Sequence, residues 1–131
     1  MNRKGSRWTI AVLVVWTLLL LVLLTMPLAE NPMPRTGIFR YWDKYVHVIL
    51  FAVTGFVSVF GVRFRRFGSR ILFGLFFSLF LAFGTELAQA FISYRSDDFY
   101  DLMADLLGVF AGLFVYMLCH LNEGLRSRLR L

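Results

Sequence analysis

The chain has 131 residues, of which 59% are hydrophobic and 17% are charged, and its mean hydropathy is +0.69. This balance excludes a water-soluble globular domain, whose surface needs many more charged side chains. The net charge of +6 would suggest a nucleic-acid partner for a soluble protein, but in a membrane protein the positions of the charges matter more than their sum. We therefore expect an integral membrane protein with no nucleic-acid partner.

Four apolar stretches follow one another, separated by short charged segments. At roughly 20 residues per helical span, they use most of the chain and leave no room for a separate aqueous domain. The sequence predicts an all-α fold: a compact bundle of four transmembrane helices that forms a single domain over residues 1–131. The predicted spans cover about residues 8–28, 43–62, 71–93 and 98–120.

The basic residues predict the orientation of the bundle. Three lie before the first span, four lie between the second and third spans, and three lie in the C-terminal tail: Arg3, Lys4, Arg7, Arg63, Arg65, Arg66, Arg70, Arg126, Arg128 and Arg130. In a four-span topology all ten fall on one side of the membrane, and basic loops stay in the cytoplasm. We expect a multi-pass protein of the bacterial cytoplasmic (inner) membrane with both termini in the cytoplasm.

Ionisable residues gather in or beside the outer halves of the last three spans. A charged side chain inside the membrane costs several kcal/mol unless it is paired or hydrated, so each one needs an explanation. The candidate ligand-binding or functional residues are Asp43, Lys44, His47, Glu86, Gln89, Arg95, Asp98, Asp101 and Asp105. No catalytic residue can be assigned from a known motif, because the chain has no nucleophile triad or nucleotide-binding loop.

Helical spacing predicts that these residues face one another. Steps of three and four place one seam on the fourth span: Asp98, Asp101, Asp105, Gly108, Gly112, Val115 and Cys119. Gly108 and Gly112 form a small-xxx-small contact for helix packing, which turns the seam toward the bundle. The third span has a matching stripe, with its phenylalanines pointing to lipid: Gly74, Ser78, Ala82, Glu86, Gln89 and Ser93. We expect an outward-opening polar pocket.

The predicted pocket is acidic, so it needs a compensating cation. Protons shared among the acids are one solution, and a cationic ligand group or a divalent metal is another. The candidate metal ligands are His47, Glu86, Asp101 and Asp105, although their spacing matches no known metal motif. No cofactor is required by the sequence. The alternative is that the polar residues only hold the helices together through hydrogen bonds.

The same residues carry a resemblance to a family. Three motifs in this order are similar to the VanZ-like family of bacterial membrane proteins: Asp43-Lys44-x-x-His47, Glu86-x-x-Gln89 and Arg95-x-x-Asp98-x-x-Asp101-x-x-x-Asp105-x-x-Gly108-x-x-x-Gly112. The family usually has Asn where this chain has Asp105. Its founding member is associated with low-level resistance to teicoplanin, so the resemblance implies a role in the cell envelope and a contribution to antibiotic resistance.

Three functions remain open at this point. We favour a binding protein whose pocket engages a membrane lipid, a lipid-linked precursor or a (lipo)glycopeptide-type amphiphile. The second hypothesis is an integral-membrane enzyme acting on a lipid head group, with His47 or Glu86 as general base. The third is a small proton-coupled transporter, for which clustered acids are also suited. The sequence leaves the oligomeric state open.

Overall fold

The computed structural model describes residues 3–25, 41–62, 64–91 and 99–129, which form four helices. They are α1 (Arg3–Thr25), α2 (Trp42–Phe60), α3 (Phe67–Ala90) and α4 (Phe99–Leu129). Each helix is long and apolar enough to cross a membrane. The prediction of an all-α bundle with four membrane spans is therefore confirmed, and the chain is a four-span membrane protein.

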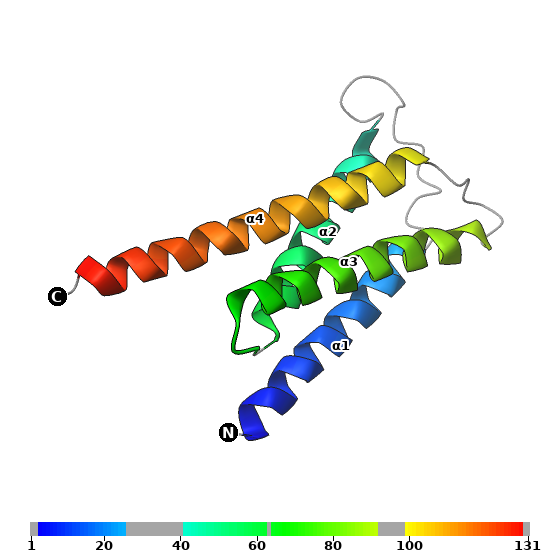
Figure 1. The fold of residues 1–131 in the computed structure, drawn as a ribbon. Coiled ribbons are helices and arrows are strands. Elements are labelled where there is room, and N and C mark those ends of the chain that lie inside the picture. Colours follow the sequence, from blue (N-terminus) through cyan, green and yellow to red (C-terminus); the bar gives the residue numbers. More distant parts are fainter. Residues whose placement is uncertain (1–2, 26–40, 63, 92–98, 130–131) are drawn as a thin grey trace.

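Successive helices run in alternating directions, so the bundle has two chemically different ends (Figure 1). At the end that we call the polar end, α1 and α3 finish while α2 and α4 begin, with Asp43 and Asp101 in their first turns. The opposite end, the basic end, has the start of α1 and the connection from α2 to α3, where Arg65 and Arg66 are exposed. The charged groups are thus separated along the bundle axis.

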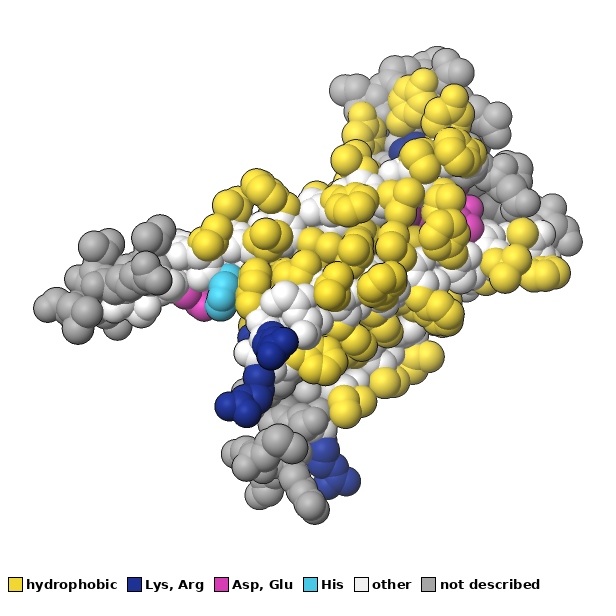
Figure 2. Space-filling model, in the orientation of Figure 1, with side chains coloured by type: hydrophobic (Ala, Val, Ile, Leu, Met, Phe, Trp, Pro, Cys, Tyr) yellow, Lys and Arg dark blue, Asp and Glu magenta, His cyan; other side chains and the backbone are white. Residues whose placement is uncertain are grey.

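Hydrophobic side chains cover the sides of the helices between these two ends. On the face drawn in Figure 2 they form a nearly continuous surface, and most of the visible Lys and Arg side chains lie toward one end. On α3, Phe76, Phe80 and Phe83 are exposed, as the sequence predicted. An exposed apolar surface of this extent is typical of helices that contact lipid.

The closest packing in the bundle is between α2 and α4, and it depends on glycine. A Cβ added to Gly112 would overlap the carbonyl of Ala52, and one added to Gly108 would overlap the carbonyl of Val48. On α2, a Cβ added to Gly55 would lie 2.7 Å from the carbonyl oxygen of Val109 on α4. The two backbones therefore touch over several turns, an approach that any larger side chain would prevent.

The predicted faces of α3 and α4 agree with the structure in part. On α3 the predicted stripe is buried at Gly74, Ser78, Ala82 and Gln89 and half-buried at Glu86, while Ser93 lies outside the described residues. On α4 the predicted seam is buried from Asp101 to Gly112, but Val115 and Cys119 are exposed, and the buried positions are instead Leu113 and Tyr116. The seam followed a repeat of 3.5 residues, whereas a straight helix has about 3.6 residues per turn and its buried face drifts by roughly 20° per heptad.

Three helices also extend beyond the predicted spans. α1 begins at Arg3, before the predicted start near residue 8. α3 begins at Phe67, so the second half of the basic segment 63–70 is the first turn of a helix and not part of the connection. Arg70 stabilises this junction by donating from Nε to the carbonyl of Phe64 at 2.7 Å. α4 continues past residue 120 to Leu129, because the tail contains strong helix formers and no proline.

The first helix is the least embedded of the four. Only Leu20 and Leu24 are fully buried among its described side chains, and it packs against α2 and α3. Trp16 fixes its position by donating from the indole Nε1 to Thr54 Oγ1 of α2 at 3.0 Å. The core of the bundle is therefore formed mainly by α2, α3 and α4.

Candidate functional site

The polar end of the bundle brings together seven of the nine predicted site residues. They come from the first turns of α2 and α4 and the last turns of α3, and we call them the polar cluster: Asp43, Lys44, His47, Glu86, Gln89, Asp101 and Asp105. The other two, Arg95 and Asp98, lie outside the described residues. The predicted packing residues Gly108 and Gly112 line the contact with α2.

An ion pair lies at the outer edge of the polar cluster. Lys44 Nζ contacts Asp101 Oδ1 directly and lies 3.4 Å from Asp43 Oδ2. The Asp101 side chain is only 6% exposed, whereas that of Asp43 is 52% exposed. A buried carboxylate without a cation would be strongly destabilising, so Lys44 compensates Asp101 first. The lysine therefore connects a buried acid to an exposed one.

One turn deeper, His47 and Asp105 form a buried pair. His47 Nδ1 lies 2.7 Å from Asp105 Oδ1, and the two side chains are 1% and 0% exposed. With Asp105 ionised, its carboxylate can only accept a hydrogen bond, so Nδ1 is the donor and Nε2 is left as the other ring nitrogen. The pair lies directly beside the contact between Gly108 and the Val48 carbonyl, so the close helix packing brings the two groups within bonding distance.

Glu86 approaches this pair from α3. One donor atom from each of His47, Glu86 and Asp105 lies within 4.8 Å of the others. Oε1 of Glu86 and Oδ2 of Asp105 are buried atoms that accept no hydrogen bond, although both residues have interaction partners. Three helices thus bring an imidazole and two carboxylates to one point inside the bundle.

Gln89 has a different partner from the rest of the polar cluster. Its amide Nε2 donates to the carbonyl of Leu24 in the last turns of α1 at 2.9 Å, and its side chain is buried. This hydrogen bond ties α3 to α1 at the polar end. Gln89 therefore has a clear structural role, although the sequence placed it among the ligand-binding residues.

The polar cluster differs from the expected open pocket in its exposure. His47, Gln89, Asp101 and Asp105 are all buried. Within the described ranges, Asp43 is exposed, and Lys44 and Glu86 are partly exposed. A ligand can therefore reach the deeper groups past Lys44 or from the side of Glu86.

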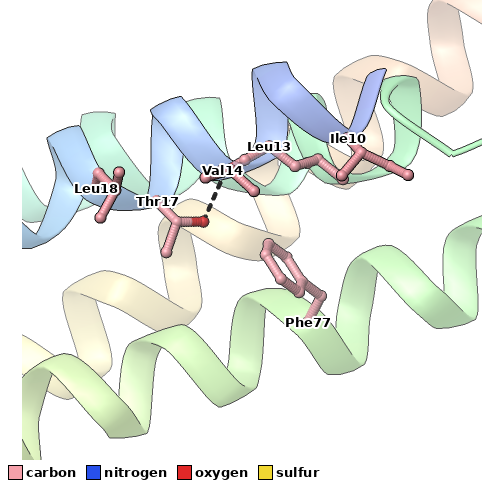
Figure 3. Close-up of a pocket in the computed structure, with 6 residues that line it drawn as sticks. All are labelled: Ile10, Leu13, Val14, Thr17, Leu18 and Phe77. Carbon is pink, nitrogen blue, oxygen red and sulfur yellow. Dashed lines mark hydrogen bonds between the residues drawn. The ribbon is translucent and has the colours of Figure 1, made fainter. Parts of the chain in front are cut away.

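A separate apolar groove lies between α1 and α3. It has a volume of about 370 Å³ and is lined by Ile10, Leu13, Val14, Thr17, Leu18 and Phe77 (Figure 3). The hydroxyl of Thr17 donates to the carbonyl of Leu13 at 2.8 Å, so it offers little polarity to the groove. The lining suits a hydrocarbon chain and no charged group.

Several buried polar groups in the middle of the bundle were not predicted from the sequence. Thr54 and Ser58 are buried on α2, and Ser58 Oγ lies 3.3 Å from Ser78 Oγ of α3. Their spacing from His47 follows the same helical face of α2, a signal that could have identified them. Thr54 and Ser58 also donate to backbone carbonyls of their own helix, which satisfies them without a ligand.

Comparison of the chain with protein-family models, with curated proteins and with solved structures found no match. The resemblance to the VanZ-like family therefore depends on the motifs in the sequence alone.

Proposed function

We propose that this chain is a VanZ-like protein of the bacterial cytoplasmic membrane whose polar cluster binds the head group of an envelope lipid or a (lipo)glycopeptide-type amphiphile. The observation that carries the proposal is the convergence of three helices on buried or half-buried ionisable groups at one end of a membrane bundle. Helices can be held together by one or two polar contacts, and further buried acids only add desolvation cost. A ligand that uses these groups explains their presence.

The edge of the polar cluster suggests how a head group is recognised. Separating Lys44 from Asp101 makes available one cation and one anion, which together complement a zwitterionic ligand. A phosphate or carboxylate of the ligand pairs with Lys44, while its ammonium group replaces Lys44 at Asp101. Asp43 lies at the exposed side of the same lysine and gives it an alternative partner during the exchange.

The groove between α1 and α3 provides a place for the apolar part of the same ligand. Its lining runs along α1 from Leu18 toward Ile10, away from the polar end. A head group at the polar cluster therefore leaves a hydrocarbon chain free to lie along the bundle in this direction. The proposal commits to one amphiphile that occupies both places.

We place the polar end in the outer leaflet. Basic segments remain in the cytoplasm, and the exposed Arg65 and Arg66 lie at the opposite end of the bundle. The polar cluster then faces the compartment in which cell-wall precursors and glycopeptide antibiotics meet the membrane. A contribution to teicoplanin resistance follows if the chain binds the antibiotic or one of these precursors.

A second candidate function is catalysis on a lipid head group, and the His47–Asp105 pair favours it. A histidine whose Nδ1 donates to a buried carboxylate is held in one orientation and one tautomer, with Nε2 able to accept a proton. The imidazole is therefore arranged as a general base. Turnover of bacterial phospholipid by the reconstituted protein, lost in His47→Gln, distinguishes this function from binding alone.

The binding function is tested by antibiotic susceptibility in a teicoplanin-sensitive bacterium that produces the chain. We expect the wild-type chain to raise the inhibitory concentration of teicoplanin, and Glu86→Gln and Asp101→Asn to remove the increase at equal protein level in the membrane. The matched control is Glu123→Gln, which removes an exposed acid of α4. Full protection by both cluster variants contradicts the proposal.

A further inference from the structure

The strongest unassigned feature of the molecule is the group formed by His47, Glu86 and Asp105. We infer that these three side chains bind one divalent transition-metal ion such as Zn²⁺ or Mn²⁺ inside the bundle. The inference does not depend on the identity of the amphiphile, because it concerns only donor atoms of the chain itself. It also narrows the set of candidate ligands that the sequence suggested, since Asp101 is held by Lys44 instead.

The donor set matches the chemistry of such an ion. One imidazole nitrogen and two carboxylate oxygens are ligands typical of zinc, iron and manganese sites. The three donor atoms lie within 4.8 Å of one another. Ligands bound at 2.0–2.2 Å from one ion lie about 3 Å apart, so rotation of the side chains is enough to close the site. Three protein ligands leave at least one position for water or a ligand oxygen.

The helix packing makes the site rigid. His47 lies on α2, Glu86 on α3 and Asp105 on α4, so three separate helices each contribute one donor. The backbones of α2 and α4 are in contact beside the group, at Gly108 and Val48. Because their backbones already touch, α2 and α4 cannot approach each other more closely or rotate freely. The donor atoms on them are therefore held near the geometry that an ion requires.

Two further observations favour an ion over internal hydrogen bonds alone. Asp105 is 0% exposed, and its Oδ2 is a buried oxygen that accepts no hydrogen bond. His47 is 1% exposed, and Oε1 of Glu86 is also a buried atom, so the three donor groups are shielded from water. A divalent ion complements two carboxylates in such a low-dielectric site with a suitable geometry.

The test is a metal titration of the purified chain without an affinity tag. Protein in detergent is treated with EDTA, freed of the chelator and titrated with Co²⁺ followed by Zn²⁺, with bound metal counted by elemental analysis. We expect one ion per chain for the wild type, and affinity weaker by about 100-fold or more in Glu86→Gln and Asp105→Asn, because even loss of an outer-shell partner costs about 10–100-fold. The visible spectrum of bound Co²⁺ should change in His47→Gln.

Two controls address the other places where a metal could bind. His120 lies beside the exposed Cys119 on α4, so His120→Gln in a Cys119→Ser background tests adventitious binding at the surface. Glu123→Gln removes an exposed acid of α4 outside the polar cluster without changing the proposed ligands. Both controls should bind one ion with affinity within about threefold of the wild type.

The titration also has outcomes that overturn the inference. A wild-type chain that binds no stoichiometric metal contradicts it directly, whether or not any variant folds. Metal binding that survives Glu86→Gln and Asp105→Asn but is lost with His120 and Cys119 shows a surface site only. Circular dichroism and size-exclusion profiles establish that each variant compared retains its helical fold.

Discussion

His47 Nδ1 and Asp105 Oδ1 lie 2.7 Å apart across the interface of α2 and α4, and neither side chain is exposed. This distance follows from the sequence of both helices. Gly108 follows Asp105 by one turn, and its missing side chain lets the backbone of α4 lie against Val48, the neighbour of His47. The glycines that pack the bundle are therefore also the residues that position its polar groups.

The first prediction concerns the glycine contact. Gly112→Ala places a Cβ against the carbonyl of Ala52, so the helices must separate and the free energy of unfolding should fall by about 1–3 kcal/mol. Gly84→Ala is the matched control, because nothing lies within 4 Å of its added Cβ. That change should be neutral or stabilising by up to about 1 kcal/mol. Denaturant unfolding in detergent micelles measures both, and equal effects would contradict the packing.

The second prediction concerns the ion pair at the edge of the polar cluster. Lys44→Met leaves Asp101 buried without its cation and should lower the free energy of unfolding by about 3 kcal/mol. The double variant Lys44→Met with Asp101→Leu removes both charges and should recover most of this loss. Asp43→Asn, at an exposed acid, should change stability by less than about 1 kcal/mol. A double variant no more stable than Lys44→Met would argue against the pair.

The third prediction separates structural from ligand-binding residues. Gln89→Leu removes the hydrogen bond to the Leu24 carbonyl and should cost about 0.5–1.5 kcal/mol of unfolding free energy. Because Gln89 is directed at α1, the variant should keep the teicoplanin phenotype of the wild type when produced at the same level. Loss of that phenotype to the extent seen for Glu86→Gln would place Gln89 in the binding site.

The fourth prediction concerns orientation in the membrane. In a Cys119→Ser background, a cysteine introduced by Asp43→Cys should react with a membrane-impermeant maleimide added to intact spheroplasts. A cysteine introduced by Arg66→Cys, which is exposed at the basic end, should react only after the membrane is permeabilised. The reverse pattern would require the polar cluster to face the cytoplasm.

Some features of the site were predictable from helical spacing and some were not. The stripe through Ser78 and Ala82 was found because residues three and four apart share a face of α3. The end of the seam on α4 was wrong at Val115 and Cys119, because small differences in helical period accumulate over several turns.

The sequence did not predict which acidic side chain pairs with which basic side chain. Lys44 was predicted as one of the ligand-binding or functional residues, and in the structure it contacts Asp101. Which acid meets which base depends on the rotation and axial position of α2 relative to α4, and these are set by the backbone contacts of Gly55, Gly108 and Gly112. A single sequence indicates that α2 and α4 pack closely. It does not indicate which residues of the two helices lie opposite each other.

Binding of an amphiphile head group by the polar cluster is tested most directly by mass spectrometry of the intact protein. The wild type, Glu86→Gln and the control Glu123→Gln are purified from the same bacterial membranes in the same mild detergent, and the lipid bound per chain is measured. We predict one head-group class enriched on the wild type and on Glu123→Gln, and lost from Glu86→Gln. An identical lipid profile for all three proteins would contradict the claim.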